Sequence, residues 1–353
     1  MALSKNKIKQ RQLGMPKPNA EEWIRQLQQS KYLAKEIDSY NQGELVQELE
    51  QRVANLLGKP AALFFGKGMA AQFAALKASE EISQCSNIAL HPLSHLAYDE
   101  ADSYQHLLQL NGNLLGKDNA PFNINDVQSI HDQISTLTVE LPLRRAGFKL
   151  TAWDELLKMS DWCHQNNVHF HLDGARIWES THFYQKTEAE ISALFDTVYV
   201  SLYKGLGSMG GALLAGGSDF IESCKVWRSR LAGNSFTLFP MVIGAMDGLD
   251  KRHSTMHELV ERAQQIAELL SEFPQLKIDR PHTNGFIIFL DGDVELLNKK
   301  AQELNADMGL QLFYQVTQFP HSDQTMIELQ VGAEHQAISD EEILSYFTQL
   351  LNT

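Results

Sequence analysis

Lys204 is the residue of this chain whose type and position most clearly favour chemistry. It ends an apolar run, residues 197–203, that is rich in β-branched and aromatic side chains, and glycines follow it at once. This pattern predicts a buried strand that delivers one amine to the end of a sheet. Because burial disfavours the charged form of lysine, it favours the neutral amine, which is the form that condenses with a carbonyl group.

Asp173 ends a second apolar run, residues 168–172, upstream of Lys204. A lysine and an aspartate at the ends of two strands are what pyridoxal phosphate chemistry requires. The lysine holds the aldehyde, and the carboxylate keeps the ring nitrogen protonated. Alone, Lys204 could be a solvated residue at a strand-to-loop junction and Asp173 part of an Asp-Gly turn. Their joint placement favours the cofactor.

Residues 66–69 lie between a predicted strand at 61–65 and a predicted helix at 69–80. At such a junction, exposed backbone N–H groups and the helix dipole create an anion site. A tight βα loop without a ligand would carry the same glycines. The segment lacks the Gly-Lys-Ser/Thr ending of nucleotide hydrolases. The candidate phosphate contacts are therefore Gly66, Lys67, Gly68 and Met69.

One histidine and three arginines complete the candidate site. His95 follows a predicted strand at 88–91, where its imidazole would cover the cofactor ring and move a proton from a substrate hydroxyl, although most histidines are structural. Arg176, close behind Asp173, would reach the ring oxygen or the substrate carboxylate. Arg228 and Arg230 offer two further guanidinium groups that could bind a phosphate. Surface salt bridges are the ordinary explanation for both.

His169, His171 and Asp173 alternate along one predicted strand and so share one face. Two imidazoles and a carboxylate can bind a metal ion, which makes a metal-dependent hydrolase or oxygenase the main rival enzyme class. That interpretation leaves Lys204 and its glycines unexplained, so we expect no metal. Packing within the sheet is the ordinary explanation for both histidines.

The composition is that of a globular protein with an acidic surface. The chain has 353 residues, a formal net charge of −14 at pH 7 and a pI near 5.4. Nucleic acids and anionic membranes attract basic surfaces, so neither is expected as a partner. Three scattered cysteines favour a reducing cytoplasm. We find neither a signal-peptide core nor an apolar stretch near the ~18 residues of a membrane span.

Predicted strands and helices alternate between residues 61 and 203, which indicates right-handed crossovers and a mostly parallel sheet. After a helical region at 241–272, the pattern becomes that of a compact α+β domain with an antiparallel sheet. Its predicted strands are 276–278, 285–290, 310–316 and 324–331. The predicted organisation is an N-terminal arm at 1–40, a large α/β domain at 41–250 and a small C-terminal α+β domain at 251–353.

Two segments, 171–176 (His-Leu-Asp-Gly-Ala-Arg) and 203–207 (Tyr-Lys-Gly-Leu-Gly), resemble the signature of the threonine aldolase and β-eliminating lyase family of pyridoxal phosphate enzymes. The resemblance runs from about residue 45 to about residue 233. It implies the aspartate aminotransferase fold (type I) and a homodimer or homotetramer with cofactor sites at subunit interfaces. The roles that it implies are Lys204 for the Schiff base, Asp173 for the pyridine nitrogen, His95 for ring stacking, Arg176 for a cofactor or substrate contact, residues 66–69 for the phosphate, and Arg228 and Arg230 for a neighbouring subunit's site.

The chain departs from that family at several positions. The family's Ser-Asp-Thr near the start is absent, residues 66–69 read Gly-Lys-Gly-Met instead of Ser-Gly-Thr-Met, and Tyr203 replaces a serine before the lysine. Residues 140–145 read Glu-Leu-Pro-Leu-Arg-Arg where the family has Glu-Asn-Thr. No arginine follows Arg280, although these aldolases commonly bind the substrate carboxylate with one. The carboxylate would then be bound by Arg176, Arg144 or Arg145.

The sequence therefore predicts an aldehyde-lyase that cleaves a β-hydroxy-α-amino acid such as threonine or allo-threonine. His95 would take the hydroxyl proton, directly or through water, and Asp173 would keep the ring electron-poor. Other reactions of the same cofactor, namely β-elimination, transamination and racemisation, remain open because they differ only in which bond is aligned. A catalytically silent scaffold with the same fold is a further alternative.

Overall fold

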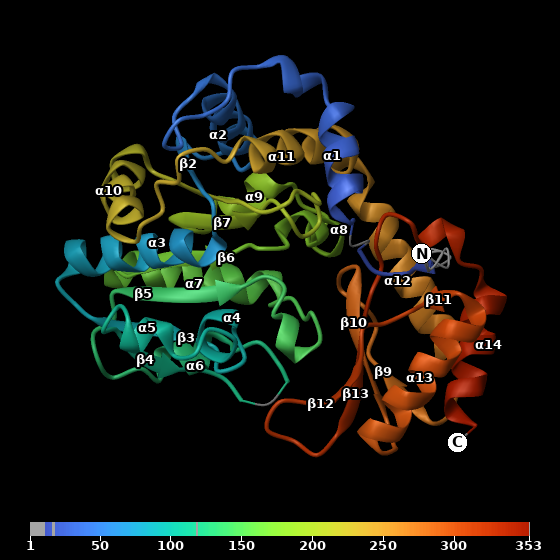
Figure 1. Ribbon diagram of the computed structural model, residues 1–353. Helices are drawn as coiled ribbons and strands as arrows, with labels where there is room; N and C mark the ends of the chain where they lie inside the picture. Colours follow the sequence, from blue (N-terminus) through green and yellow to red (C-terminus); the bar gives the residue numbers. More distant parts are fainter. Residues whose placement is uncertain (1–10, 16–17, 118, 353) are drawn as a thin grey trace. The chain divides into compact units, whose positions relative to one another are not determined.

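The computed structural model describes residues 11–15, 18–117 and 119–352, whose course is drawn in Figure 1. These residues form two compact units. The larger is Pro18–His257, and the smaller combines the described parts of Met1–Lys17 and Glu258–Thr353. The predicted N-terminal arm lies partly outside the described residues. Its described part contributes β1 (Arg11–Gln12) to the smaller unit and α1 (Ala20–Gln28) and η1 (Lys31–Ala34) to the larger one.

The larger unit is built on a seven-stranded sheet with the order β2-β8-β7-β6-β5-β3-β4. Neighbours from β7 to β4 are parallel, whereas β8 is antiparallel to both β2 and β7. The predicted mostly parallel sheet is thus confirmed. The strands are β2 (Ala61–Phe65), β3 (Asn87–Leu90), β4 (Asn111–Leu114), β5 (Thr136–Glu140), β6 (His169–Asp173), β7 (Thr197–Ser201) and β8 (Ala212–Gly216).

The sequence patterns predict neither β4 nor β8. The residues of β8 read Ala-Leu-Leu-Ala-Gly, without the β-branched and aromatic side chains that mark strands. The strand is nevertheless fully buried between β2 and β7, so tertiary burial rather than local preference determines it. β4 contains two asparagines and a glycine, which are depleted in strands, and it pairs only with β3 at the edge of the sheet.

Helix α3 (Gly68–Ser83) packs beside α10 (Ser218–Arg230), as Figure 1 shows. The buried side of α3 is rich in alanine, and these small side chains let the helix approach both α10 and strands β2, β7 and β8 closely. The other helices of the larger unit are α2 (Glu44–Leu56), α4 (His95–Tyr98), α5 (Ser103–His106), α6 (Ile124–Gln128), α7 (Trp153–Asn166), α8 (Thr181–Tyr184), α9 (Glu188–Ser192) and α11 (Phe239–Lys251), with 3-10 turns at Arg144–Ala146, Ile177–Glu179 and His253–Thr255.

The chain passes into the smaller unit within α12 (Met256–Leu270). This unit has a four-stranded antiparallel sheet with the order β12-β13-β10-β9 and a separate pair of β1 with β11. The predicted strand at 310–316 is wrong, because its ends belong to two short strands in different sheets. The remaining elements are β9 (Leu276–Ile278), β10 (Gly285–Leu290), α13 (Val294–Met308), β11 (Leu310–Gln311), β12 (Val316–Gln318), β13 (Thr325–Gln330), a 3-10 turn at His335–Ala337 and α14 (Asp340–Leu351).

Among the helices that the structure describes, none combines the length and the apolar character needed to cross a membrane.

Candidate active site

Three strands of the larger unit bring polar side chains to one edge of the sheet. Asp173 is the last residue of β6, and its register partners are Glu140 at the end of β5 and Tyr199 in β7. Lys204 follows β7, which ends at Ser201. Because these strands are parallel, their carboxyl ends meet at the edge where open α/β sheets bind ligands. Lys204 and Asp173 therefore come to the same edge.

Asp173 is buried, and both of its carboxylate oxygens accept hydrogen bonds. Oδ2 accepts one from Nε2 of Gln72 at 2.7 Å, and Oδ1 accepts one from the backbone N–H of Ala175 at 3.1 Å. Gln72 belongs to α3 and is itself fully buried. No sequence motif marks Gln72, because one glutamine among alanines forms no pattern. Its only signal is a polar side chain at an otherwise apolar helical position.

The amine of Lys204 lies among charged groups of both signs. Burial lowers its pKa, and the positive charges of Arg176 and Arg144 act in the same direction. The negative charges of Asp173 and Glu140 oppose the shift, and the resulting pKa is about 8. Near neutral pH a sizeable fraction of this amine is therefore neutral and able to attack a carbonyl carbon.

Glu140 adds a second carboxyl group with unusual properties to this edge. Its Oε2 accepts a hydrogen bond from the backbone N–H of His95 at 2.7 Å, and its Oε1 accepts one from the backbone N–H of Arg144 at 3.1 Å. Burial raises the pKa of Glu140 to about 7, and the charge of Asp173 reinforces the shift. Glu140 thus ties the helix that carries His95 to the turn that carries the arginines.

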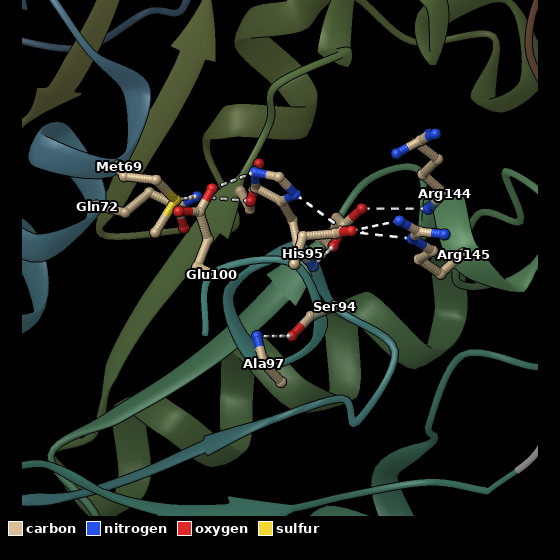
Figure 2. Close-up of polar contacts among 11 residues, drawn as sticks. Met69, Gln72, Ser94, His95, Ala97, Glu100, Arg144 and Arg145 are labelled. Carbon is tan, nitrogen blue, oxygen red and sulfur yellow. Dashed lines mark hydrogen bonds and ion pairs between the residues drawn. The ribbon is translucent and has the colours of Figure 1, made fainter. Parts of the chain in front are cut away.

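His95 is the first residue of α4, and both of its ring nitrogens contact carboxylates (Figure 2). Nδ1 lies 3.1 Å from Oδ2 of Asp99, and Nε2 lies 2.9 Å from Oε1 of Glu100. The hydrogen bond with Asp99 raises the pKa of His95, while burial opposes the shift. Asp99 also accepts a hydrogen bond from Nε of Arg145 at 3.2 Å and pairs with Nη2 of the same guanidinium.

The turn at residues 66–69 joins β2 to the N-terminus of α3, as predicted. Its N-cap residue, Lys67, makes no side-chain capping hydrogen bond, and the first backbone N–H groups of a helix have no partner within the helix. Gly68 lies against Tyr199 so closely that a Cβ atom there would be 2.2 Å from the tyrosine Oη. The junction therefore combines an anion-binding helix end with a position that only glycine fits.

Replacing Gly68 with alanine is expected to lower the free energy of unfolding by about 1–3 kcal/mol, the usual cost of overpacking, because Tyr199 must move. Denaturation in urea measures the change. The double variant Gly68→Ala/Tyr199→Phe should recover part of the loss. Gly217→Ala is the matched control, since a Cβ there meets nothing within 4 Å. A Gly68→Ala protein as stable as the wild type would contradict the contact.

The predicted arginines lie in different surroundings. Arg176 lies near enough to Lys204 for its positive charge to lower the pKa of that amine. Arg228 is buried, and its Nη1 donates at 2.8 Å to the carbonyl oxygen of Phe64, just before the turn at 66–69. Arg230 instead pairs at 2.8 Å with Glu81, near the far end of α3. The fold of a single chain thus brings Arg176 and Arg228 toward the candidate site and directs Arg230 away from it.

His169 and His171 bind within the sheet. Nε2 of His169 lies 2.7 Å from Oγ1 of Thr197, and Nδ1 of His171 lies 2.8 Å from the same oxygen. Burial lowers the pKa of His169 to about 4 and that of His171 to about 3. Over the described parts of the chain, no group of three or more His, Cys, Asp and Glu side chains is arranged to hold a metal ion.

Asp99 and Glu100 were not among the site residues predicted from the sequence. The sequence does hold a local indication of the contact between His95 and Asp99. The two residues are four apart, and residues with this spacing are neighbours on a helix. The contact of Arg145 with Asp99 joins segments far apart in the sequence and has no such local signal.

Two solved structures match almost the whole chain. A proposed L-allo-threonine aldolase from Listeria monocytogenes is 34% identical and covers 97% of this chain and 96% of its own, with a TM-score of 0.91. A proposed aromatic amino acid β-eliminating lyase/threonine aldolase from Exiguobacterium is 29% identical and covers 97% of both chains, with a TM-score of 0.90. The fold expected from the resemblance is thereby confirmed.

Sequence comparisons agree with the structural ones. A low-specificity L-threonine aldolase from Candida albicans is 27% identical over 262 residues, which are 71% of this chain and 69% of that protein. The model of the β-eliminating lyase family matches residues 25–293, well over half of the chain. The chain therefore belongs to the β-eliminating lyase family and is a pyridoxal phosphate-dependent lyase of the aspartate aminotransferase fold type.

Proposed function

We propose that this protein splits a β-hydroxy-α-amino acid, such as threonine or allo-threonine, into glycine and an aldehyde. The observation that carries the proposal is the meeting of Lys204, Asp173 and His95 at one edge of the sheet, where the charges of the aspartate and the lysine both act on the pKa of the histidine. The relatives described as threonine aldolases support the same substrate class.

The residues at this edge fit pyridoxal 5′-phosphate. Lys204 has the lowered pKa that binding an aldehyde requires, and Asp173 is a buried carboxylate held in place by two donors. The turn at 66–69 has the uncapped helix N-terminus that suits a phosphate, and Arg228 lies beside it. When bound, the cofactor supplies an electron sink for the electrons of the Cα–Cβ bond.

In this proposal each protein group has a separate task. Lys204 would hold the cofactor's aldehyde and release it to the substrate amine. Asp173 would face the ring nitrogen and favour its protonated form. His95 accepts the proton of the substrate's β-hydroxyl group at Nε2, which lets the oxygen become the carbonyl oxygen of the aldehyde as the Cα–Cβ bond breaks.

We assign the substrate carboxylate to Arg144 and Arg176. Both guanidinium groups lower the pKa of Lys204, so both lie within electrostatic reach of the amine around which the substrate reacts. Arg145 pairs with Asp99. This assignment gives the carboxylate two cationic partners in a chain that has no arginine after Arg280.

Incubation of the holoenzyme with each of the four threonine isomers and with phenylserine tests the proposal. We expect at least one of them to release an aldehyde and an equal amount of glycine, measured by reduction of the aldehyde with a coupled dehydrogenase and by amino-acid analysis. The matched blank is the Lys204→Ala protein under the same conditions. No aldehyde from any of the five compounds would contradict the proposal.

β-Elimination is the second candidate reaction, because one structural relative is described as a β-eliminating lyase as well as a threonine aldolase. It would use the same residues on a substrate with a leaving group at Cβ, and it would yield ammonia and a keto acid instead of glycine. Transamination and racemisation would also break the Cα–H bond, and they would yield, respectively, a keto acid without free ammonia and the mirror image of the substrate. Product analysis over a panel of amino acids distinguishes all four.

We also propose a cytoplasmic homodimer or homotetramer with the cofactor site at the subunit interface. The support is the family membership of the chain. Light scattering of the purified protein measures the oligomeric state.

A further inference from the structure

The imidazole of His95 is held between two carboxylates. In Figure 2, Glu100 lies on one side of the ring and Arg145 on the other. Asp99 pairs with both the ring and that guanidinium. Glu100 contacts Nε2 at 2.9 Å, and Asp99 contacts Nδ1 at 3.1 Å. An ionised carboxylate only accepts hydrogen bonds, and a neutral imidazole donates from one nitrogen only. The protonated imidazole, which donates from both nitrogens, matches both contacts.

The two carboxylates differ in how firmly they are held. The guanidinium of Arg145 pairs with both oxygens of Asp99, in the bidentate geometry that fixes an arginine–carboxylate pair most firmly. Hydrogen bonds from His95 and Arg145 lower the pKa of Asp99 against the opposing effect of burial, so this carboxylate stays ionised. Glu100 follows α4 and contacts His95 from the next segment of chain.

We propose that Asp99, clamped by Arg145, is a positioning residue that keeps a proton on Nδ1 of His95 and presents Nε2 to the substrate. Glu100 holds the Nε2 position until a substrate hydroxyl group replaces it. This inference deepens the proposed aldehyde-lyase activity and rests on it, because it names the groups that prepare His95 for proton transfer.

The protons balance over one turnover: two proton movements accompany the cleavage, and Cα of the product then takes up one proton, which the neutral acid of Glu100 supplies as it returns to its carboxylate form. As Glu100 withdraws, it takes the Nε2 proton with it and becomes a neutral acid. Nε2 is left with a lone pair, while Nδ1 keeps its proton and donates it in the hydrogen bond to Asp99. The β-hydroxyl proton then moves to that lone pair, its oxygen forms the carbonyl double bond, and the Cα–Cβ electron pair passes to the electron sink. Asp99 stabilises the imidazolium that results, without becoming protonated itself.

The charges around His95 determine the direction of the pH effects. Three acidic groups raise the pKa of the ring, one cation lowers it, and a fourth carboxylate, Glu100, contacts Nε2. They come from the end of α4 and the segment after it, from β5 and β6, and from the loop after β7: Asp99, Glu100, Glu140, Asp173 and Lys204. The base form of His95 is present above its pKa. Removal of an acidic neighbour lowers that pKa and extends the active range to lower pH.

The experiment uses the holoenzyme with ¹⁵N-labelled histidine, in which the His95 signals are identified by their loss in His95→Gln. The ¹⁵N shifts report which nitrogen carries the proton and at what pH the second proton is lost, whether or not the protein turns over a substrate. The variants are Asp99→Asn, Asp99→Glu, Arg145→Gln and Glu100→Gln. Asp250→Asn, which disturbs another arginine–aspartate pair of the larger unit, is the matched control.

Each variant has a distinct expected result. Asp99→Asn should abolish the preference for the Nδ1 proton and lower kcat roughly 100-fold with KM little changed, as for loss of one acid–base group. Asp99→Glu should restore part of the activity, and Arg145→Gln should weaken the preference less than Asp99→Asn does. Glu100→Gln should keep the proton on Nδ1 of His95. It should lower the pKa of His95 by roughly one unit and shift the acid limb of the kcat/KM profile to lower pH by the same amount.

Two results would overturn the positioning role of Asp99. One is an Asp99→Asn protein that keeps the Nδ1 proton, and the other is a kcat that falls no further than in Asp250→Asn. An acid limb that stays in place in Glu100→Gln would overturn the role of Glu100. If the wild type releases no aldehyde, the proposed activity fails, while the ¹⁵N shifts of the Asp99 variants still decide whether the carboxylate sets the proton on the ring.

Discussion

Lys204→Ala is expected to remove both the visible absorbance of bound pyridoxal phosphate and all detectable aldehyde release. The alanine has no amine to hold the aldehyde, and the remaining contacts at 66–69 and Asp173 bind the cofactor only non-covalently. The same band in the wild type should form faster as the pH is raised through about 8, because the neutral fraction of the amine grows as its lowered pKa is passed. Absorbance after reconstitution and gel filtration measures the first effect, and stopped-flow mixing measures the second.

A second partly buried lysine, Lys59, provides the control. Lys59 donates a hydrogen bond to the carbonyl oxygen of Phe195, and burial lowers its pKa as well. Lys59→Ala should therefore change stability but leave the absorbance band and the turnover in place. A Lys204→Ala protein that keeps the band and releases aldehyde at the wild-type rate would refute the role of Lys204, and with it the chemistry proposed for this site.

Asp173→Asn is expected to lower kcat by roughly 10- to 1,000-fold while the cofactor remains bound. The carboxylate opposite the ring nitrogen favours the protonated form of that nitrogen. Loss of an adjacent negative charge lowers the pKa of such a group by roughly 1–3 units. The asparagine keeps the shape and one of the two acceptor oxygens that Gln72 and the backbone N–H of Ala175 contact, but it loses the charge. Measured kcat and the ¹⁵N shift of labelled cofactor report the loss of activity and the loss of the ring proton separately.

Asp196→Asn is the matched control, because Asp196 precedes β7 at the opposite edge of the sheet and accepts a hydrogen bond from the backbone N–H of Phe170 at 2.8 Å. It should lower stability without changing the state of the ring nitrogen. Equal kcat values for Asp173→Asn and the wild type, with the ring nitrogen still protonated, would show that Asp173 is not its partner.

The sequence by itself determined the strands that carry the chemistry. The apolar runs before Lys204 and Asp173 have the period and length of buried strands, and the alternation with helices makes those strands parallel. Parallel strands end at one edge, so the meeting of these two residues follows from local pattern and topology. The turn at 66–69 is predictable for the same reason, since a strand end, two glycines and a helix start are all local features.

Only the tertiary structure decided which groups surround these residues. Gln72 reaches Asp173 from another element, and Arg145 reaches Asp99 from a distant segment. No spacing rule relates the residues of such pairs, because packing of helices and loops on the sheet sets the distances. The same packing buries β8 despite its weak strand preference and directs Arg230 to Glu81. Local patterns thus specify where a strand ends, and the contacts made there depend on elements that only folding brings together.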